Sequence, residues 1–149
     1  MLNKTEVLKA VQSELEYKLN SIQESFDDAN SALASETKSS AGDKHETGRA
    51  MAQLEQEKLS GQLENLIQLQ EGLSRINPKD YFNTVQFGSI VETSNGFFFI
   101  SVGLGAVKIE DTTVFSLSIT SPIGQQMAGK KKNDEIQFNG KTIKILDVF

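Results

Sequence analysis

The sequence has no cysteine, which excludes a disulfide framework and a zinc ribbon. It also has no hydrophobic run that approaches the length of a membrane span, and its longest apolar stretch lies near residues 97–100. The N-terminal residues carry charges at Lys4, Glu6 and Lys9 and lack the apolar core of a signal peptide. These absences predict a soluble, cytoplasmic protein with no membrane partner.

The motifs of self-contained catalysis are missing as well. His45 is the only histidine, and no Cys or Ser nucleophile is paired with it. There is no Walker loop, hydrolase elbow or HExxH motif. Gly103 and Gly105 lack the third glycine and the following helix of a dinucleotide fingerprint, so we expect a turn or bulge there. The three lysines at 130–132 are typical of a solvated loop. We therefore expect that the chain is not itself an enzyme.

Charge is unevenly distributed along the 149 residues. Residues 1–77 contain 8 Lys or Arg against 13 Asp or Glu, a net charge of −5, whereas residues 78–149 contain 7 of each. A nucleic-acid backbone attracts cations, so an acidic segment does not suit direct binding to it. It suits a basic channel or a basic protein partner.

Two long segments have the apolar periodicity of amphipathic helices, with most steps of three or four residues. Asn77-Pro78 ends the second of them. Two helices of this length with a short connection predict an antiparallel hairpin, or coiled coil, over residues 1–77, about 45 Å long. The first seam comprises Leu8, Val11, Leu15, Leu19, Ile22, Phe26, Ala29 and Leu33. The second comprises Met51, Leu54, Leu59, Leu63, Leu66, Leu73 and Ile76, with Ile67 beside it.

After residue 80 the apolar period changes to two, which is typical of strands. Asn95-Gly96 and Asn139-Gly140 are tight-hairpin signals. Ser121-Pro122 reads as a helix cap followed by proline at the first helical position, before a short helix at 123–128. We therefore predict an α+β protein whose second domain, residues 78–149, is a small antiparallel β-sheet with one short helix. The expected strands are residues 85–91, 96–102, 113–120, 135–138 and 141–148.

The segment between the two helices, residues 41–50, is the candidate functional tip. Gly42 interrupts the helical pattern, so the chain can turn there. Asp43 and Glu46 follow, three residues apart, a spacing that places two carboxylates on one face of a helix. One interpretation is structural, with Asp43 as a helix cap and Glu46 as its capping-box partner. The other is functional, with the acidic pair as oxygen ligands for a divalent cation.

The layout resembles the Gre family of bacterial transcript-cleavage factors, over nearly the whole chain. At the tip, Gly42-Asp43 followed two residues later by Glu46 is similar to the family's Gly-Asp-x-x-Glu pattern. The most specific likeness is C-terminal. It comprises Ser121-Pro122-Ile123-Gly124, Gly129-Lys130-Lys131, Asp134 and Gly140 with its closing Ile-rich strand, together with Phe87-Gly88-Ser89-Ile90-Val91.

This resemblance implies an FKBP-like sheet domain that docks on the rim of the RNA polymerase secondary channel, with Ser121 and Pro122 in the contacting loop. It implies that the hairpin reaches down the channel towards the RNA 3′ end. Asp43 and Glu46 would then help to hold a second Mg²⁺, shared with the polymerase, during cleavage of backtracked RNA. Two carboxylates are too few ligands for a stable magnesium site in the free protein.

The tip also departs from the family pattern. Thr47 takes the position of an Asn, Arg49 replaces an acid and Ala50 replaces an aromatic residue. Arg49 lowers the local negative charge, which weakens the recruitment of a cation. Two further interpretations stay open: a channel-binding regulator that does not promote cleavage, and a coiled-coil adaptor that uses the flank of the hairpin. An isomerase-like enzyme is disfavoured by the lack of an aromatic pocket signature.

Overall fold

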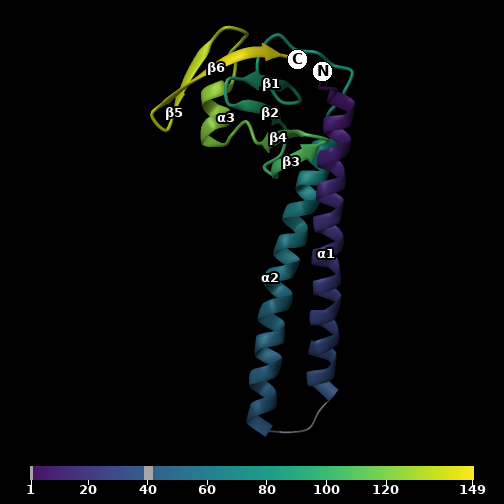
Figure 1. Cartoon of the computed structure of the whole chain (residues 1–149). Helices are drawn as coiled ribbons and strands as arrows, with labels where there is room; N and C mark the ends of the chain where they lie inside the picture. Colours follow the sequence, from purple (N-terminus) through teal and green to yellow (C-terminus); the bar gives the residue numbers. More distant parts are fainter. Residues whose placement is uncertain (1, 39–41) are drawn as a thin grey trace. The chain divides into compact units, whose positions relative to one another are not determined.

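The computed structural model describes residues 2–38 and 42–149, apart from the side chains of 36–38 and 42–46. It confirms the α+β class: two long helices precede a six-stranded sheet with one short helix (Figure 1). The chain forms two compact units. Unit 1 comprises Met1–Leu15 and Leu69–Phe149, and unit 2 comprises Glu16–Gln68. The division at residue 77 that the sequence suggests stays a prediction.

The hairpin consists of α1 (Lys4–Lys38) and α2 (Gly42–Ser74), and unit 2 contains most of both helices. The apolar seam of α1 faces inward as predicted, with Ala29 buried and Ile22 and Phe26 half-buried. Among the described residues, no helix is both long enough and apolar enough to cross a membrane.

The seam of α2 differs from the sequence prediction in its first half. Met51 and Leu54 are 67% and 66% exposed, so their assignment to the seam is wrong. Ala52 and Gln56 are half-buried in their place, and the spacing continues through Leu59. Residues 52, 56 and 59 are spaced by four and three positions, so their side chains lie on the same inward face of α2, whereas residues 51 and 54 lie on a more exposed face. A less apolar pair of residues thus occupies the seam near the start of α2.

A polar contact crosses this part of the hairpin. The side-chain amide of Gln56 donates a hydrogen bond to Oδ1 of Asn30, and both side chains are half-buried. A polar pair at a seam position favours the register in which both partners are satisfied. This contact therefore helps to fix how α1 and α2 are aligned within unit 2.

The sheet of unit 1 has the strand order β3-β4-β2-β1-β6-β5. The prediction of a wholly antiparallel sheet is wrong at one pair, because β2 and β4 are parallel. The edge strand β3 was missed, since Gly103 and Gly105 suggested only a turn; Gly105 instead begins that strand with a φ of +90°. The strands are β1 (Ile90–Thr93), β2 (Gly96–Ile100), β3 (Gly105–Ile109), β4 (Thr112–Leu117), β5 (Glu135–Phe138) and β6 (Lys141–Val148).

The tight hairpin predicted at Asn139-Gly140 is confirmed, whereas the one predicted at Asn95-Gly96 turns one residue earlier, at Ser94 and Asn95. Phe138 pairs with Lys141, and the two residues between them, Asn139 and Gly140, have φ angles of 51° and 75°. Positive φ at both central positions is the geometry of the turn that suits the twist of a hairpin. In the other hairpin, β1 and β2 pair from Thr93 to Gly96. These turns set the register of the strands that they connect.

The central strand β2 is covered on both faces, as its aromatic run predicts. Phe98 is 8% exposed and Phe99 is fully buried. On one face, Phe98 belongs to a cluster that includes Met127 of the short helix α3 (Pro122–Met127). Residues near the outer ends of the hairpin helices, including Val7 and Leu73, are also fully buried within unit 1. The ends of α1 and α2 therefore take part in the core of the sheet unit.

One buried cation lies in unit 1. Lys4 is 3% exposed, and its Nζ donates a hydrogen bond to the main-chain oxygen of Asp80 at 2.7 Å. The same Nζ lies 4.7 Å from the ring centroid of Phe82 and 5.6 Å from that of Tyr81. Burial lowers the pKa of Lys4 from its usual 10.5, and the charge of Asp80 partly opposes this shift. These contacts hold the start of α1 against residues 80–82, which follow α2 in the chain.

Candidate functional site

The tip of the hairpin is the first part of the candidate site. Helix α2 begins at Gly42, where the sequence suggested a turn, and the connecting residues 39–41 lie outside the described part of the chain. Asp43 and Glu46 have helical backbones in the first turns of α2. Their side chains, like that of His45, lie outside the described residues. The shared face of the two carboxylates, and their role as metal ligands, therefore stay predictions.

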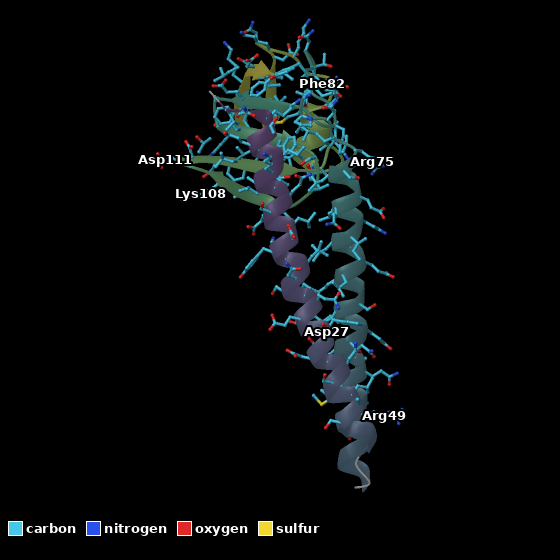
Figure 2. The ribbon with its side chains drawn as sticks, turned by 90° about the vertical axis from the view of Figure 1, so that its right-hand side faces the viewer. Asp27, Arg49, Arg75, Phe82, Lys108 and Asp111 are labelled. Carbon is cyan, nitrogen blue, oxygen red and sulfur yellow. The ribbon has the colours of Figure 1, made fainter. Side chains whose placement is uncertain are left out.

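Three of the four described residues that directly follow the acidic pair are exposed. Thr47, Arg49 and Ala50 lie on the surface of α2, and Gly48 is half-buried. Figure 2 shows Arg49 near the end of the hairpin, with its side chain directed outward. Arg49 follows Glu46 by three residues, or nearly one helical turn, so both lie along one side of α2. A cation thus follows Glu46 by three residues in the sequence of α2.

No group of three or more His, Asp or Glu side chains that could hold a metal ion occurs among the described residues. Carboxylate oxygens are nevertheless the ligands that Mg²⁺ prefers, and it usually keeps several ligands from water and substrate. The side chains of Asp43 and Glu46 lie outside the described residues, so a metal site shared with a second macromolecule stays a prediction.

Ser121 and Pro122 form the start of α3. The Oγ of Ser121 accepts a hydrogen bond from the backbone N–H of Gly124 at 3.1 Å and donates one to the main-chain oxygen of Ser118 at 2.6 Å. Ser121 is thus the N-cap of α3, and Pro122 stands in its first turn, as the sequence predicts. Pro122 is exposed and remains accessible to a partner.

Gly124 has a steric role beside this cap. A Cβ built on Gly124 would lie 2.3 Å from the main-chain oxygen of Ser118 and 2.9 Å from backbone atoms of Ile119. Ile123, between Pro122 and Gly124, packs against the cluster that contains Met127. Folding alone therefore accounts for each residue of the Ser-Pro-Ile-Gly motif, and polymerase contact by Ser121 and Pro122 stays a prediction.

The lysines at 130–132 lie in an exposed loop, as predicted. The backbone N–H of Lys131 donates to Oδ2 of Asp134 at 2.9 Å, and the backbone N–H of Val85 donates to the main-chain oxygen of Lys130 at 2.8 Å. These bonds shape the loop that leads into β5. Asp134, which belongs to the C-terminal motif that resembles the Gre family, thus stabilises the conformation of this loop.

Unit 2 exposes three large apolar side chains whose exposure the sequence does not predict. They are Tyr17, which is 72% exposed, and Met51 and Leu54, which the apolar period assigns to the seam. The signal that could have identified the exposure of Met51 and Leu54 is the competing register through Ala52 and Gln56. Exposed large apolar side chains are typical of interaction surfaces where they form one contiguous patch, whereas single ones are normal on a protein surface.

No protein-family profile matches this chain, and a search of curated proteins finds no relative. Among solved structures, the chain is similar to one described as the structure of the transcription factor Gfh1. The two sequences are 20% identical, the alignment covers 94% of each chain, and the TM-score is 0.38.

Proposed function

We propose that this protein is a Gre-like transcription elongation factor that binds RNA polymerase in its secondary channel and stimulates the enzyme's intrinsic cleavage of backtracked RNA. The observation that carries the proposal is the position of Asp43 and Glu46 in the first turns of α2, at the junction of two helices of 35 and 33 residues. The motifs that resemble the Gre family, at the tip and in the sheet unit, support it.

In this proposal the chain supplies part of a metal site. A second Mg²⁺ in the polymerase active centre stabilises the attacking and leaving oxygens of phosphodiester hydrolysis when it is bound. Asp43 and Glu46 would hold that ion with their carboxylate oxygens and would orient a water molecule beside it. The surface of the sheet unit that carries Pro122 contacts the rim of the channel. The protein is then an activator, and the polymerase is the enzyme.

The test is RNA cleavage in a stalled, backtracked elongation complex at limiting Mg²⁺. We expect the protein to accelerate cleavage, and Asp43→Asn or Glu46→Gln to remove at least about tenfold of the acceleration, as losing a metal ligand or an oriented acid–base group does. Glu71→Gln is the matched control, because Glu71 is an exposed acid on the same helix, far along the sequence from the tip. Equal loss in all three variants would contradict the role of the tip.

The exposed Arg49 favours a second candidate, a channel-binding regulator that does not promote cleavage. Its positive charge, three residues after Glu46, opposes the recruitment of a cation. In the same assay such a regulator competes with a known channel-binding factor but leaves the cleavage rate unchanged or lower. A protein that neither accelerates cleavage nor competes would instead fit a coiled-coil adaptor.

A further inference from the structure

Two sections of the hairpin in unit 2 differ in the side chains that face the seam. We call residues 16–28 of α1 and 59–68 of α2 the base section, and residues 29–35 of α1 and 47–58 of α2 the outer section. Both sections belong to the same compact unit, and α-helix runs through each of them (Figure 1). A difference in stability between the two sections therefore comes from their side chains.

The base section has an apolar core. Large apolar side chains of both helices are buried or half-buried there, at a spacing of three or four residues. Burial of one apolar face supplies most of the stability of a helix in a protein. The side chains of this core are Leu19, Ile22 and Phe26 of α1 and Leu59, Leu63 and Leu66 of α2.

The described residues of the outer section form no such core. Between residues 34 and 50 the sequence contains no apolar side chain larger than that of alanine, and Met51 and Leu54 lie on the exposed face of α2. Leu33 is the one large apolar side chain that is half-buried among the residues described in this section. The other buried or half-buried positions are Ala29 and Asn30 of α1 and Gly48, Ala52 and Gln56 of α2.

A polar contact crosses the outer section, between the side-chain amide of Gln56 and Oδ1 of Asn30. When the helices separate, water can replace each amide as the partner of the other, so this hydrogen bond adds little to the free energy that keeps the helices together. It does fix their register once they are closed. A helix shorter than about 15 residues is itself only marginally stable in water. The outer section is therefore held closed less strongly than the base section.

We infer that the outer section opens and closes as one segment in the free protein while the base section stays closed. The boundary on α2 lies between Gln56, the last polar position of the seam, and the buried Leu59. One consequence rests on the proposed function: the part of α2 that leads to Glu46 and Asp43 is held closed only when the walls of the channel enclose it. Ordering of this segment then accompanies binding, as it does for other segments that fold on a partner.

Amide hydrogen exchange of the unchanged protein, followed by NMR, tests the inference without any partner. The ratio of each amide's rate in an unfolded chain to its rate in the protein gives a protection factor. We expect similar protection at all amides of residues 47–56 and protection at least about tenfold higher from Leu59 onwards. Equal protection along the whole hairpin would overturn the inference. A gradual decline from residue to residue would also overturn it, because simple fraying of the helix ends produces that profile.

A helix-breaking substitution distinguishes two sections from one cooperative hairpin. Gln53 and Gln68 are exposed residues of α2, one in each section. Proline inside a helix lowers the equilibrium constant for helix formation by a factor of roughly a hundred. We expect Gln53→Pro to remove the protection of the outer section and to change that of the base section by less than about twofold. A loss of roughly a hundredfold in the base section would show that the hairpin opens as one unit.

Gln68→Pro is the matched control, since it makes the same chemical change in the base section. It should lower the protection of the base section by roughly a hundredfold, which shows that the measurement detects a proline there. If Gln68→Pro does not fold, Gln68→Gly takes its place, with an expected loss of about threefold. Base protection that neither substitution changes would overturn the assignment of the base section to the stable part of the hairpin.

Exchange in the presence of purified core RNA polymerase, followed by mass spectrometry of peptides, separates the inference from the proposed function. Binding with at least about tenfold higher protection of the outer section supports both. Binding without added protection leaves the proposed function standing and overturns the ordering step. If the protein does not bind, the proposed function fails, and the protection factors of the free protein still decide whether the outer section opens by itself.

Discussion

The substitution Gly124→Ala tests whether the start of α3 is determined by the close approach of its backbone to residue 118. In a helix interior, alanine is more favourable than glycine by about 1 kcal/mol. At Gly124, however, the new methyl group would lie 2.3 Å from the main-chain oxygen of Ser118, whereas ordinary contacts begin at 3.4 Å. The overlap exceeds 1 Å, and the opposing atoms belong to the backbone, so no side-chain rotation relieves it.

We therefore expect Gly124→Ala to lower the free energy of unfolding of the sheet unit. Relief requires a shift of α3, which would disturb Met127, a fully buried member of the core cluster. Overpacking of this kind costs about 1–3 kcal/mol, and the backbone clash places the expected loss at about 2–3 kcal/mol. For a unit of this size, such a loss lowers the midpoint of thermal unfolding by roughly 10 °C or more.

The assay is urea-induced unfolding, followed by near-UV circular dichroism of the aromatic residues in the sheet unit. Gly61→Ala is the matched control, because a Cβ on that helical glycine would meet no atom within 4 Å. Followed by far-UV circular dichroism, it should stabilise the hairpin by about 1 kcal/mol. Opposite signs for the two substitutions support the steric account. A Gly124→Ala protein as stable as the unchanged one would refute it.

Two further predictions concern polar groups in the two units. Because the pKa of Lys4 is lowered in the folded state, the unfolded chain binds more protons between that pKa and 10.5, so stability gains from this group as pH rises through that interval. Relative to Lys4→Met, the unchanged protein should become more stable in urea titrations as pH approaches 10.5, and parallel pH profiles would contradict this. In the hairpin, Gln56→Leu should cost about 1 kcal/mol, because it leaves the Asn30 amide without its partner. The double variant with Asn30→Leu should recover that loss in thermal unfolding, and additive effects would show that the two amides are not coupled.

Short sequence motifs correctly predicted the helix cap and the turn, because these features depend only on residues that are neighbours in the sequence. The cap at Ser121, the proline after it and the Asn139-Gly140 turn were all read from short motifs, because each motif satisfies its own backbone geometry. The order of strands depends on distant pairings. The insertion of β4 beside β2 leaves β3 at the edge, and no local signal in Gly103–Gly105 reveals that arrangement.

The sequence predicted one part of the candidate site, the acidic pair, but assigned the wrong residues to the seam of α2 next to it. Two apolar registers compete near the start of α2, one through Met51 and Leu54 and one through Ala52 and Gln56. Hydrophobicity alone favoured the first, but the amide of Gln56 is satisfied by Asn30 across the hairpin, and the second register continues into Leu59. The acidic pair was found from its spacing, and its proposed role in metal binding depends on ligands that a partner would supply, which this sequence does not contain.

The discontinuity of unit 1 has a consequence for synthesis of the protein on the ribosome. Lys4 hydrogen-bonds the main chain of Asp80, 76 residues later, and β1 pairs with β6, which is made only when residues 141–148 have been translated. The hairpin of unit 2 needs only neighbouring segments and can form early in the nascent chain. Lys4 can therefore make its contact only after residue 80 has been translated. The order of folding is then not a simple N-to-C progression: the hairpin in the middle of the chain forms first, and the pairing of β1 with β6 comes last.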